Sequence, residues 1–143
     1  MELCTIDMLA EKLKQKGLKA TKFRKTLLKT FSDCNSSLTT NEVVKNLEDR
    51  YNKATIYRAI YSFEKNGIIH QVPDAKGLSR YAICMDNCSR GIHHHLHAHL
   101  ICNQCNQTYC IQEISVPSLS NTYGLNIENA ELTLKGNCRS CRL

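Results

Sequence analysis

Four cysteines of this sequence stand in two closely spaced pairs. Cys102 and Cys105 form one Cys-x-x-Cys motif, and Cys138 and Cys141 form a second one. Two such pairs supply four thiolates, the ligand set that closes a tetrahedral structural zinc site. Redox-active pairs or free thiols are the alternative. We expect one zinc ion that ties the tail of the chain to the middle of its second half and contributes directly to folding.

A second group of metal-binding side chains is a histidine cluster, which holds five of the six histidines between His93 and His99. Because side chains alternate along a strand, His95, His97 and His99 are expected to point to one face, with the apolar residues between them on the other. A file of imidazoles suits zinc, nickel, copper or iron. A solvated, tag-like run is the alternative, which the intervening apolar residues and the nearby Cys102 disfavour.

Three more residues are expected near this cluster: His70 on a first hairpin strand, Cys84 at the end of the hairpin, and Cys110 on a strand after the first cysteine pair. Taken singly, each has a plain explanation, since free cysteines are often small buried hydrophobes. Together with the cluster they predict a site of nitrogen and sulfur donors, which favours zinc over iron or manganese. The candidate sensor ligands are His70, Cys84, His97, His99 and Cys110, with His95 as a further candidate.

The elements that must position these residues fall into two halves. In residues 1–84, apolar residues at helical spacing predict one helix ended by Gly17, a second opened by Thr21, a third opened by Thr39, and a fourth over 53–66 ended by Gly67. Glu42, three residues after Thr39, completes a capping box. Two strand-like runs follow at 68–72 and 79–84. Helices followed by a β-hairpin predict a winged helix-turn-helix, with 53–66 as the recognition helix.

The second half reads as a small α+β unit. Strands are expected over 97–102, 108–114 and 125–135, with a short helix over 116–123. The predicted organisation is therefore α+β: a winged-helix DNA-binding domain (1–84), a hinge or linker (85–94), and a metal-binding domain (95–143).

The positive charge of the chain is confined to its first half. Residues 1–83 carry 15 Lys and Arg against 9 Asp and Glu, whereas residues 84–143 carry 4 of each kind. Eight basic residues and no acid lie from Lys12 to Lys29. A solvated helix face is the plain explanation, but so local an excess favours a polyanionic partner, above all DNA.

Several function classes are disfavoured. No segment is apolar enough to span a membrane and no secretory signal is recognisable, so a cytoplasmic protein is expected. Nine cysteines, an odd number, indicate metal binding more than disulfides in a reducing compartment. The chain lacks HExxH, GxSxG and phosphate-loop motifs, and no Glu stands two residues after a clustered histidine as in zinc deaminases. An enzyme with a small-molecule substrate is therefore not expected.

These motifs together resemble the ferric uptake regulator (Fur) superfamily over nearly the whole chain. The matching stretches are Gly17-Leu18-Lys19-Ala20-Thr21 with Arg24, Ala54-Thr55-Ile56-Tyr57-Arg58, Gly67-Ile68-Ile69, His95-x-His97-x-His99-Leu100-Ile101-Cys102-x-x-Cys105, and Cys138-x-x-Cys141. The resemblance implies a winged-helix domain hinged to an α+β dimerisation domain. It also implies homodimers that bind palindromic operators on double-stranded DNA when metal is loaded. The implied DNA-binding residues are Lys19, Arg24, Thr55, Tyr57 and Arg58.

The sensor site departs from the iron-sensing members of that superfamily. Ser37 stands where they have a histidine and Ala82 where they have an acid, while Leu96, Ala98 and Ala130 replace the ligands of an auxiliary site. Cys84, His70 and the two histidines His97 and His99 match the zinc uptake regulator (Zur) branch, and Cys110 falls where many members place an acidic ligand. The expectation is a repressor with one structural zinc and a second, regulatory ion, zinc by preference.

Other functions stay open at this point. Within the same superfamily, the chain could be a peroxide or thiol redox sensor that uses Cys84, Cys88 or Cys110, or a nickel- or iron-responsive regulator. Outside it, a zinc hydrolase or a metal buffer is disfavoured, by the missing catalytic Glu and by the basic first half respectively.

Overall fold

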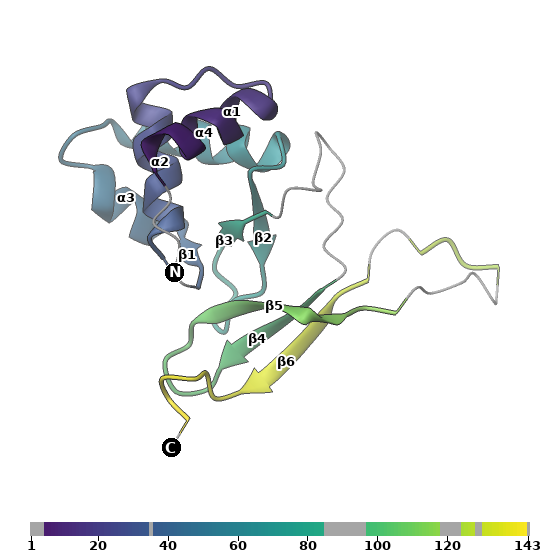
Figure 1. Cartoon of the computed structure of the whole chain (residues 1–143). Coiled ribbons are helices and arrows are strands. Elements are labelled where there is room, and N and C mark those ends of the chain that lie inside the picture. Colours follow the sequence, from purple (N-terminus) through teal and green to yellow (C-terminus); the bar gives the residue numbers. More distant parts are fainter. Residues whose placement is uncertain (1–4, 35, 85–96, 118–123, 128–129, 143) are drawn as a thin grey trace.

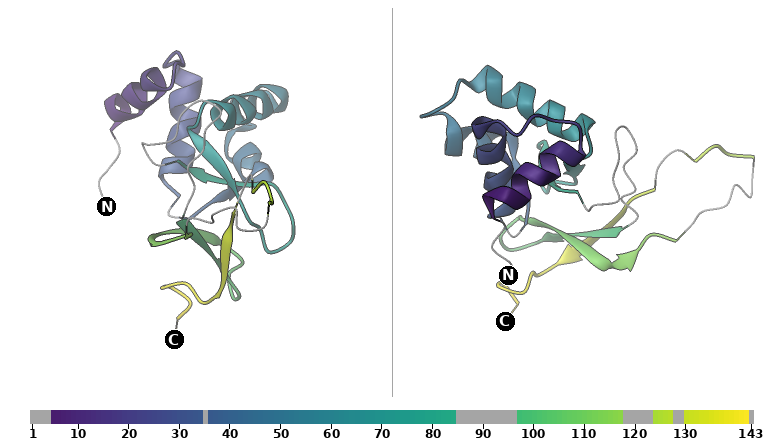
Figure 2. Two further views of the ribbon diagram at one scale, coloured as in Figure 1. Left: turned by 90° about the vertical axis from the view of Figure 1, so that its right-hand side faces the viewer. Right: turned by 45° about the horizontal axis from the view of Figure 1, so that its top comes forward.

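A computed structural model describes residues 5–34, 36–84, 97–117, 124–127 and 130–142. Figure 1 shows the helices gathered above a separate sheet, with a small hairpin between the two layers, and the views of Figure 2 agree. The helices are α1 (Ile6–Gln15), α2 (Lys22–Ser32), α3 (Thr40–Leu47) and α4 (Lys53–Lys65). The strands are β1 (Leu38–Thr39), β2 (Ile69–Val72), β3 (Arg80–Ile83), β4 (His97–Cys102), β5 (Thr108–Ser115) and β6 (Leu132–Gly136). The α+β class is confirmed.

Local sequence signals place the helix ends as expected. Thr21 caps α2, and Thr39 and Glu42 form the capping box of α3, in which each residue's side chain accepts from the other's backbone N–H at 3.2 and 2.7 Å. These bonds satisfy N–H groups that have no partner within the helix. Gly17 and Gly67 follow α1 and α4 with φ of +77° and +72°, a left-handed conformation that glycine adopts without strain and that ends a helix.

The core of the first half is built from the apolar faces of the four helices. Its fully buried members include Leu13, Leu27, Val43, Ile56 and Phe63, and Ile68 and Ile69 extend it under the hairpin. Side chains of this size stabilise the fold by roughly 1.5–3 kcal/mol each when fully buried. This core fixes α4 on the outside of the molecule and anchors the start of β2.

The hairpin of β2 and β3, with the turn between them, forms the wing. Its sheet has the order β1-β3-β2 and is antiparallel throughout, with Leu38 opposite Tyr81 and His70 opposite Ala82. The strand β1 was not expected from the sequence, because two residues are too short to show an alternating pattern and they pair only once β3 is in place.

The second sheet has the order β5-β4-β6, in which β4 pairs antiparallel with β5 and parallel with β6. The expected strand over 97–102 is confirmed, but the strand expected from Leu125 begins only at Leu132, because residues 124–127 are not paired with any strand. The expected helix over 116–123 lies mostly outside the described residues; its first two, Val116 and Pro117, are not helical. The expected linker, 85–94, and His95 also lie outside them.

Candidate metal centres

The four cysteines of the two Cys-x-x-Cys motifs meet at one end of the second sheet. Their sulfur atoms all lie within 4.8 Å of one another, and the Sγ atoms of Cys105 and Cys138 are 3.9 Å apart. Ligands bound tetrahedrally at zinc-to-donor distances of 2.0–2.3 Å lie about 3.3–3.8 Å apart, so four thiolates in this arrangement fit one zinc ion. All four come from the second half of the chain.

A tight loop over residues 102–107, here called the knuckle, holds the first pair. The N–H of Cys102 donates to the carbonyl of Gln107 at 2.9 Å, and the N–H of Asn106 donates to the carbonyl of Cys102 at 2.9 Å. Asn106 has a φ of +59°, a left-handed conformation that asparagine tolerates better than most residues. The knuckle is therefore closed by its own backbone before any metal binds.

Hydrogen bonds prepare thiolates at this centre. Backbone N–H groups of Cys105 and Cys138 lower the pKa of Cys102 to about 6. The pKa of Cys138 is also lowered, because a hydrogen bond from the hydroxyl of Tyr109 outweighs the opposing effect of burial. Cys141 keeps its proton, with a pKa raised to about 12 by its hydrogen bonds to Cys138 and the neighbouring thiols and by burial. At least one zinc ligand is thus ionised at neutral pH, the state in which a thiol binds metal.

A second cluster joins the two halves of the molecule. His70 from β2 meets His97 and His99 from β4 and Cys110 from β5, with one donor atom of each within 4.8 Å of the others. Nε2 of His70 lies 3.4 Å from Nε2 of His99 and 3.7 Å from Sγ of Cys110. These separations again match the edges of a tetrahedral site.

The strand register explains why three of these residues meet. His99 and Cys110 are direct partners across β4 and β5, so their side chains leave the same face of the sheet. A register shift between His97 and Ala98 re-aims the start of β4, and the rings of His97 and His99 lie 4.7 Å apart. His70 enters from the wing, and all three histidines are nearly inaccessible to solvent (4–7% exposed).

Cys84, the fifth expected ligand, lies on the other side of the His70 ring. The residue is 1% exposed, and its sulfur is 3.6 Å from Nδ1 of His70. Its carbonyl accepts a hydrogen bond of 3.1 Å from the Lys12 ammonium group of α1. The structure therefore places one thiol beside each ring nitrogen of His70: Cys84 at Nδ1 and Cys110 at Nε2.

Burial sets the protonation of this cluster. It lowers the pKa of His97, and it lowers that of His99 to about 4, with a further contribution from the neighbouring His97 that outweighs the opposing effect of the Glu131 charge. Both imidazoles are neutral at physiological pH, the form that binds metal. Burial raises the pKa of Cys110 to about 11, so its thiol must lose a proton when it binds an ion.

Comparisons with known proteins extend these observations. The model of the Ferric uptake regulator family matches residues 15–135. The chain belongs to the ferric uptake regulator family. As a member it is a metal-responsive, DNA-binding transcription regulator and not an enzyme, and the resemblance inferred from the sequence is confirmed. No helix in the described part of this Fur-family chain is long and apolar enough to cross a membrane.

Relatives of this Fur-family regulator differ in their metal. The chain is 29% identical over 134 residues to a ferric uptake regulation protein of Staphylococcus aureus, covering 91% of this chain and 93% of that protein. It is 24% identical over 133 residues to a zinc uptake regulation protein of Mycobacterium tuberculosis, covering 88% and 96%.

Solved structures show the same fold. A zinc uptake regulator complexed with zinc and DNA matches with a TM-score of 0.71 and 19% identity, covering 98% of this chain and 96% of that one. The ferric uptake regulator of Vibrio cholerae matches with a TM-score of 0.58 and 23% identity, covering 90% and 98%. Because both iron and zinc regulators share this fold, the metal that this regulator binds must be inferred from its own candidate ligands.

The expected DNA-binding residues of the Fur-family chain lie on α4, at the start of α2 and, for Lys19, three residues before α2. On α4, Tyr57 and Arg58 are exposed while Ile56 between Thr55 and Tyr57 is buried, so the helix turns a polar face outward. Lys19 is also exposed.

At the start of α2, the guanidinium group of Arg24 donates to the carbonyl of Lys19 at 3.1 Å. This hydrogen bond fixes the backbone that presents the Lys19 side chain. Lys19 and Arg24, two of the three basic residues expected to contact DNA, are therefore held together, and their contacts with DNA stay a prediction.

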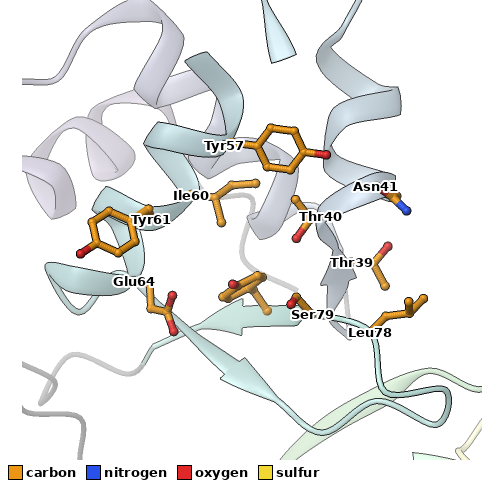
Figure 3. A pocket seen from close by; sticks show the side chains of 10 residues that line it. Thr39, Thr40, Asn41, Tyr57, Ile60, Tyr61, Glu64, Leu78 and Ser79 are labelled. Atoms are coloured by element: carbon orange, nitrogen blue, oxygen red, sulfur yellow. The ribbon is translucent and has the colours of Figure 1, made fainter. Parts of the chain in front are cut away.

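A hollow of about 400 Å³ lies between α4, the start of α3 and the wing. Figure 3 shows Tyr57 and Tyr61 of α4 on one side of it, with Thr40 and Asn41 of α3 and Leu78 of the wing on the other. Tyr61 is 65% exposed. It was not among the DNA-binding residues expected from the sequence, although it stands four residues after Tyr57 and hence on the same helix face. We expect Tyr61 to border the DNA-binding face.

Proposed function

We propose that this protein is a zinc-responsive repressor of metal-uptake genes that acts in the cytoplasm as a homodimer on palindromic operators. The observation that carries the proposal is the donor set of the second cluster. Three imidazoles and one thiol come together there, with no carboxylate among the described residues of the group. Nitrogen and sulfur donors suit zinc, whereas manganese and iron(II) sites commonly include oxygen donors.

Glu131 acts on His99 through its charge but is not one of the four grouped donors, and two positions next to the group lack an acid. Ala82 stands directly opposite His70 in the wing, and Cys110 stands directly opposite His99 in the second sheet. An acid at either position would bring an oxygen donor into reach of the cluster. These two residues therefore support zinc over the iron named for the Staphylococcus aureus relative.

The ring nitrogen of His70 that binds the ion determines whether Cys110 or Cys84 is the thiolate ligand. In the arrangement described above, Nε2 faces His99 and Cys110, so His70, His97, His99 and Cys110 form the proposed ligand set. Cys84 at Nδ1 then holds the ring in position, as outer partners of metal-bound histidines do. If Nδ1 were the ligand atom instead, Cys84 would be the thiolate ligand.

Ligands from both halves make this centre suitable as a switch. An ion bound there favours the arrangement in which the wing lies against the second sheet, to the extent that it binds that arrangement more tightly than any other. In a homodimer, as the family resemblance implies, the arrangement sets the distance between two recognition helices to about 34 Å, one turn of DNA. The zinc uptake regulator whose structure was solved in complex with zinc and DNA shares this fold, which supports the proposal.

The tetrathiolate centre has a different proposed role. Its four ligands lie in one half, so a zinc ion bound there stabilises that half whether or not the wing is docked. We therefore propose two zinc ions per chain, one structural and one exchangeable.

Metal analysis combined with a DNA-binding assay tests the proposal. The purified protein is treated with a mild chelator, its metal content is measured, and gel shifts on a palindromic operator are recorded before treatment, after it, and after addition of zinc, iron(II), manganese or nickel. We expect one zinc to resist, a second to leave together with DNA binding, and zinc to restore binding at the lowest free concentration. DNA binding that persists with one zinc would contradict the proposal, and restoration by iron(II) at lower concentration would assign the site to iron.

A thiol redox sensor is the second candidate, because Cys84 and Cys110 flank the same histidine. The raised pKa of Cys110 disfavours it, since a protonated thiol reacts slowly with peroxide. Peroxide that releases DNA while both zinc ions stay bound would move this candidate ahead.

A further inference from the structure

The two halves of the molecule also meet at a polar contact that contains no expected metal ligand. It joins the wing and the segment before β1 to the end of the knuckle, through four hydrogen bonds between the halves. Ser36 Oγ and Arg80 Nη1 both donate to Gln107 Oε1 at 3.0 Å, Ser37 Oγ donates to the Thr108 carbonyl at 2.9 Å, and Thr108 Oγ1 donates to the Pro73 carbonyl at 2.7 Å. These six residues are called the clasp.

Arg80 is the buried charge of the clasp. The residue is 5% exposed, and its Nε donates to Asp74 Oδ1 at 2.7 Å, while Nη1 also donates to the Ser37 carbonyl at 3.1 Å. Burial raises the pKa of Asp74, but the hydrogen bonds from Arg80 and from the backbone N–H groups of Leu78 and Lys76 outweigh it, so the net shift is downward and the carboxylate stays charged. A buried guanidinium group favours every acceptor in reach, and Gln107 is the side-chain acceptor that the other half supplies.

Gln107 is held by the knuckle of the tetrathiolate centre. Its backbone carbonyl accepts the hydrogen bond from the N–H of Cys102, so the loop that carries Cys102 and Cys105 also fixes where the Gln107 side chain points. Thr108, the next residue, is 1% exposed and opens β5, two residues before Cys110. The clasp thus connects the structural metal centre to the wing that carries His70.

We propose that Arg80 and Gln107 are positioning residues, which hold the wing against the second sheet so that His70 meets His97, His99 and Cys110 before an ion binds. This inference rests on the proposed function of the second cluster. When only the docked arrangement binds metal, the apparent affinity equals the intrinsic affinity multiplied by the fraction of molecules that are docked. The clasp raises that fraction, and so it sets the free zinc concentration to which the regulator responds.

The test compares Gln107→Leu with Gln104→Leu, a matched change at an exposed glutamine of the same knuckle. In Q107L, Arg80 keeps Asp74 and the Ser37 carbonyl as partners, so we expect the variant to fold and to retain its tightly bound zinc. Chelator competition should show the exchangeable zinc bound at least about 30-fold more weakly, the effect of losing a hydrogen bond to a charged group and a second, neutral one. DNA affinity at saturating zinc should stay close to that of the wild type. Q104L should change neither quantity.

Two further measurements keep the outcomes distinct. Small-angle X-ray scattering on protein without the exchangeable zinc should show a larger radius of gyration for Q107L than for Q104L and the wild type. Gln107→Glu, which keeps an acceptor for Arg80, should restore both compactness and zinc affinity. Unchanged scattering and unchanged zinc affinity in Q107L would overturn the inference.

Two other outcomes are also decisive. If Q107L is expanded relative to the wild type but the wild type binds no exchangeable zinc, the clasp is upheld and the proposed zinc-responsive function is rejected. If Q107L does not fold, Ser36→Ala removes one bond to Gln107 from a partly exposed position, and an unchanged zinc affinity there would equally overturn the inference.

Discussion

The two candidate metal centres of this regulator are built from similar residues but differ in what they connect. The tetrathiolate centre draws all its ligands from the second half, whereas the histidine and cysteine cluster takes His70 from the wing and the rest from β4 and β5. An ion whose ligands all come from one half stabilises that half and does not respond to the arrangement of the two halves. The binding free energy of an ion held between the two halves depends on how they are arranged, which is the requirement for a switch.

The two clusters also differ in the pKa values of their thiols. Cys102 at the tetrathiolate centre has a pKa lowered to about 6, because backbone N–H groups point at its sulfur. Cys110 at the second cluster has a pKa raised to about 11, because it is buried without such donors. The first centre thus offers an ionised thiolate at neutral pH, although Cys141 must still lose its proton to zinc, whereas Cys110 of the second cluster is protonated until an ion binds.

The largest effect is expected from a substitution that removes a ligand of the tetrathiolate centre. Cys102→Ser removes the ligand that is both ionised and part of the knuckle, so we expect loss of the tightly bound zinc, loss of cooperative unfolding of the second half, and loss of the dimer. Metal analysis, circular dichroism during heating and sedimentation velocity measure these quantities. A zinc-free C102S protein that stays dimeric with the Tm of the wild type would show that the centre is not structural.

A smaller, selective effect is expected at the second cluster. Cys110→Ser removes a proposed ligand and should weaken binding of the exchangeable zinc by more than about 100-fold, the upper end of the loss caused by removing only an outer partner, and leave the tight zinc and the Tm nearly unchanged. Cys84→Ser should weaken it less, because Cys84 contacts the ring of His70 from the other side. Chelator competition on both variants measures the difference, and the reverse order would identify Cys84 as the thiolate ligand.

The pH dependence of binding of the exchangeable zinc should show which thiol of the second cluster loses its proton. With a pKa of about 11, Cys110 is protonated in the zinc-free cluster between pH 6 and 9, while His99, with a pKa of about 4, is already neutral. One proton leaves per zinc bound, so affinity should rise about tenfold per pH unit and fall equally as the pH is lowered. Titration calorimetry in buffers of different ionisation enthalpy counts the proton. If C110S still releases one proton per zinc bound, the proton comes from another thiol.

The smallest expected effect lies on the DNA-binding face and should leave both centres intact. Lys19→Ala removes one exposed positive charge, so operator affinity should fall several-fold at low salt, similarly for specific and non-specific DNA, and the dependence on salt should decrease by about one counterion. Fluorescence anisotropy over a salt series measures this. An altered zinc content, or an unchanged salt dependence, would contradict the role assigned to Lys19.

Much of the fold could be predicted because its signals are local. The caps at Thr21 and Thr39 and the helix ends at Gly17 and Gly67 act within one turn of the chain, and the structure has them where the sequence indicates. The strand β1 and the true start of β6 at Leu132 could not be predicted, since each depends on a partner strand distant in sequence. Arg80 gave no signal either, because a charged residue in a strand reads as exposed unless its partners are known.

The tetrathiolate cluster could be predicted from the chain alone, because each Cys-x-x-Cys pair brings two sulfurs together through its own short loop. The kind of donors available to the second cluster could be predicted in the same way. Which of these donors meet depends on the folded structure: the register that sets Cys110 opposite His99, the irregularity at His97, and the docking of the wing that brings in His70. Contacts between distant strands depend on how the two halves pack, and no local spacing in the chain encodes that packing.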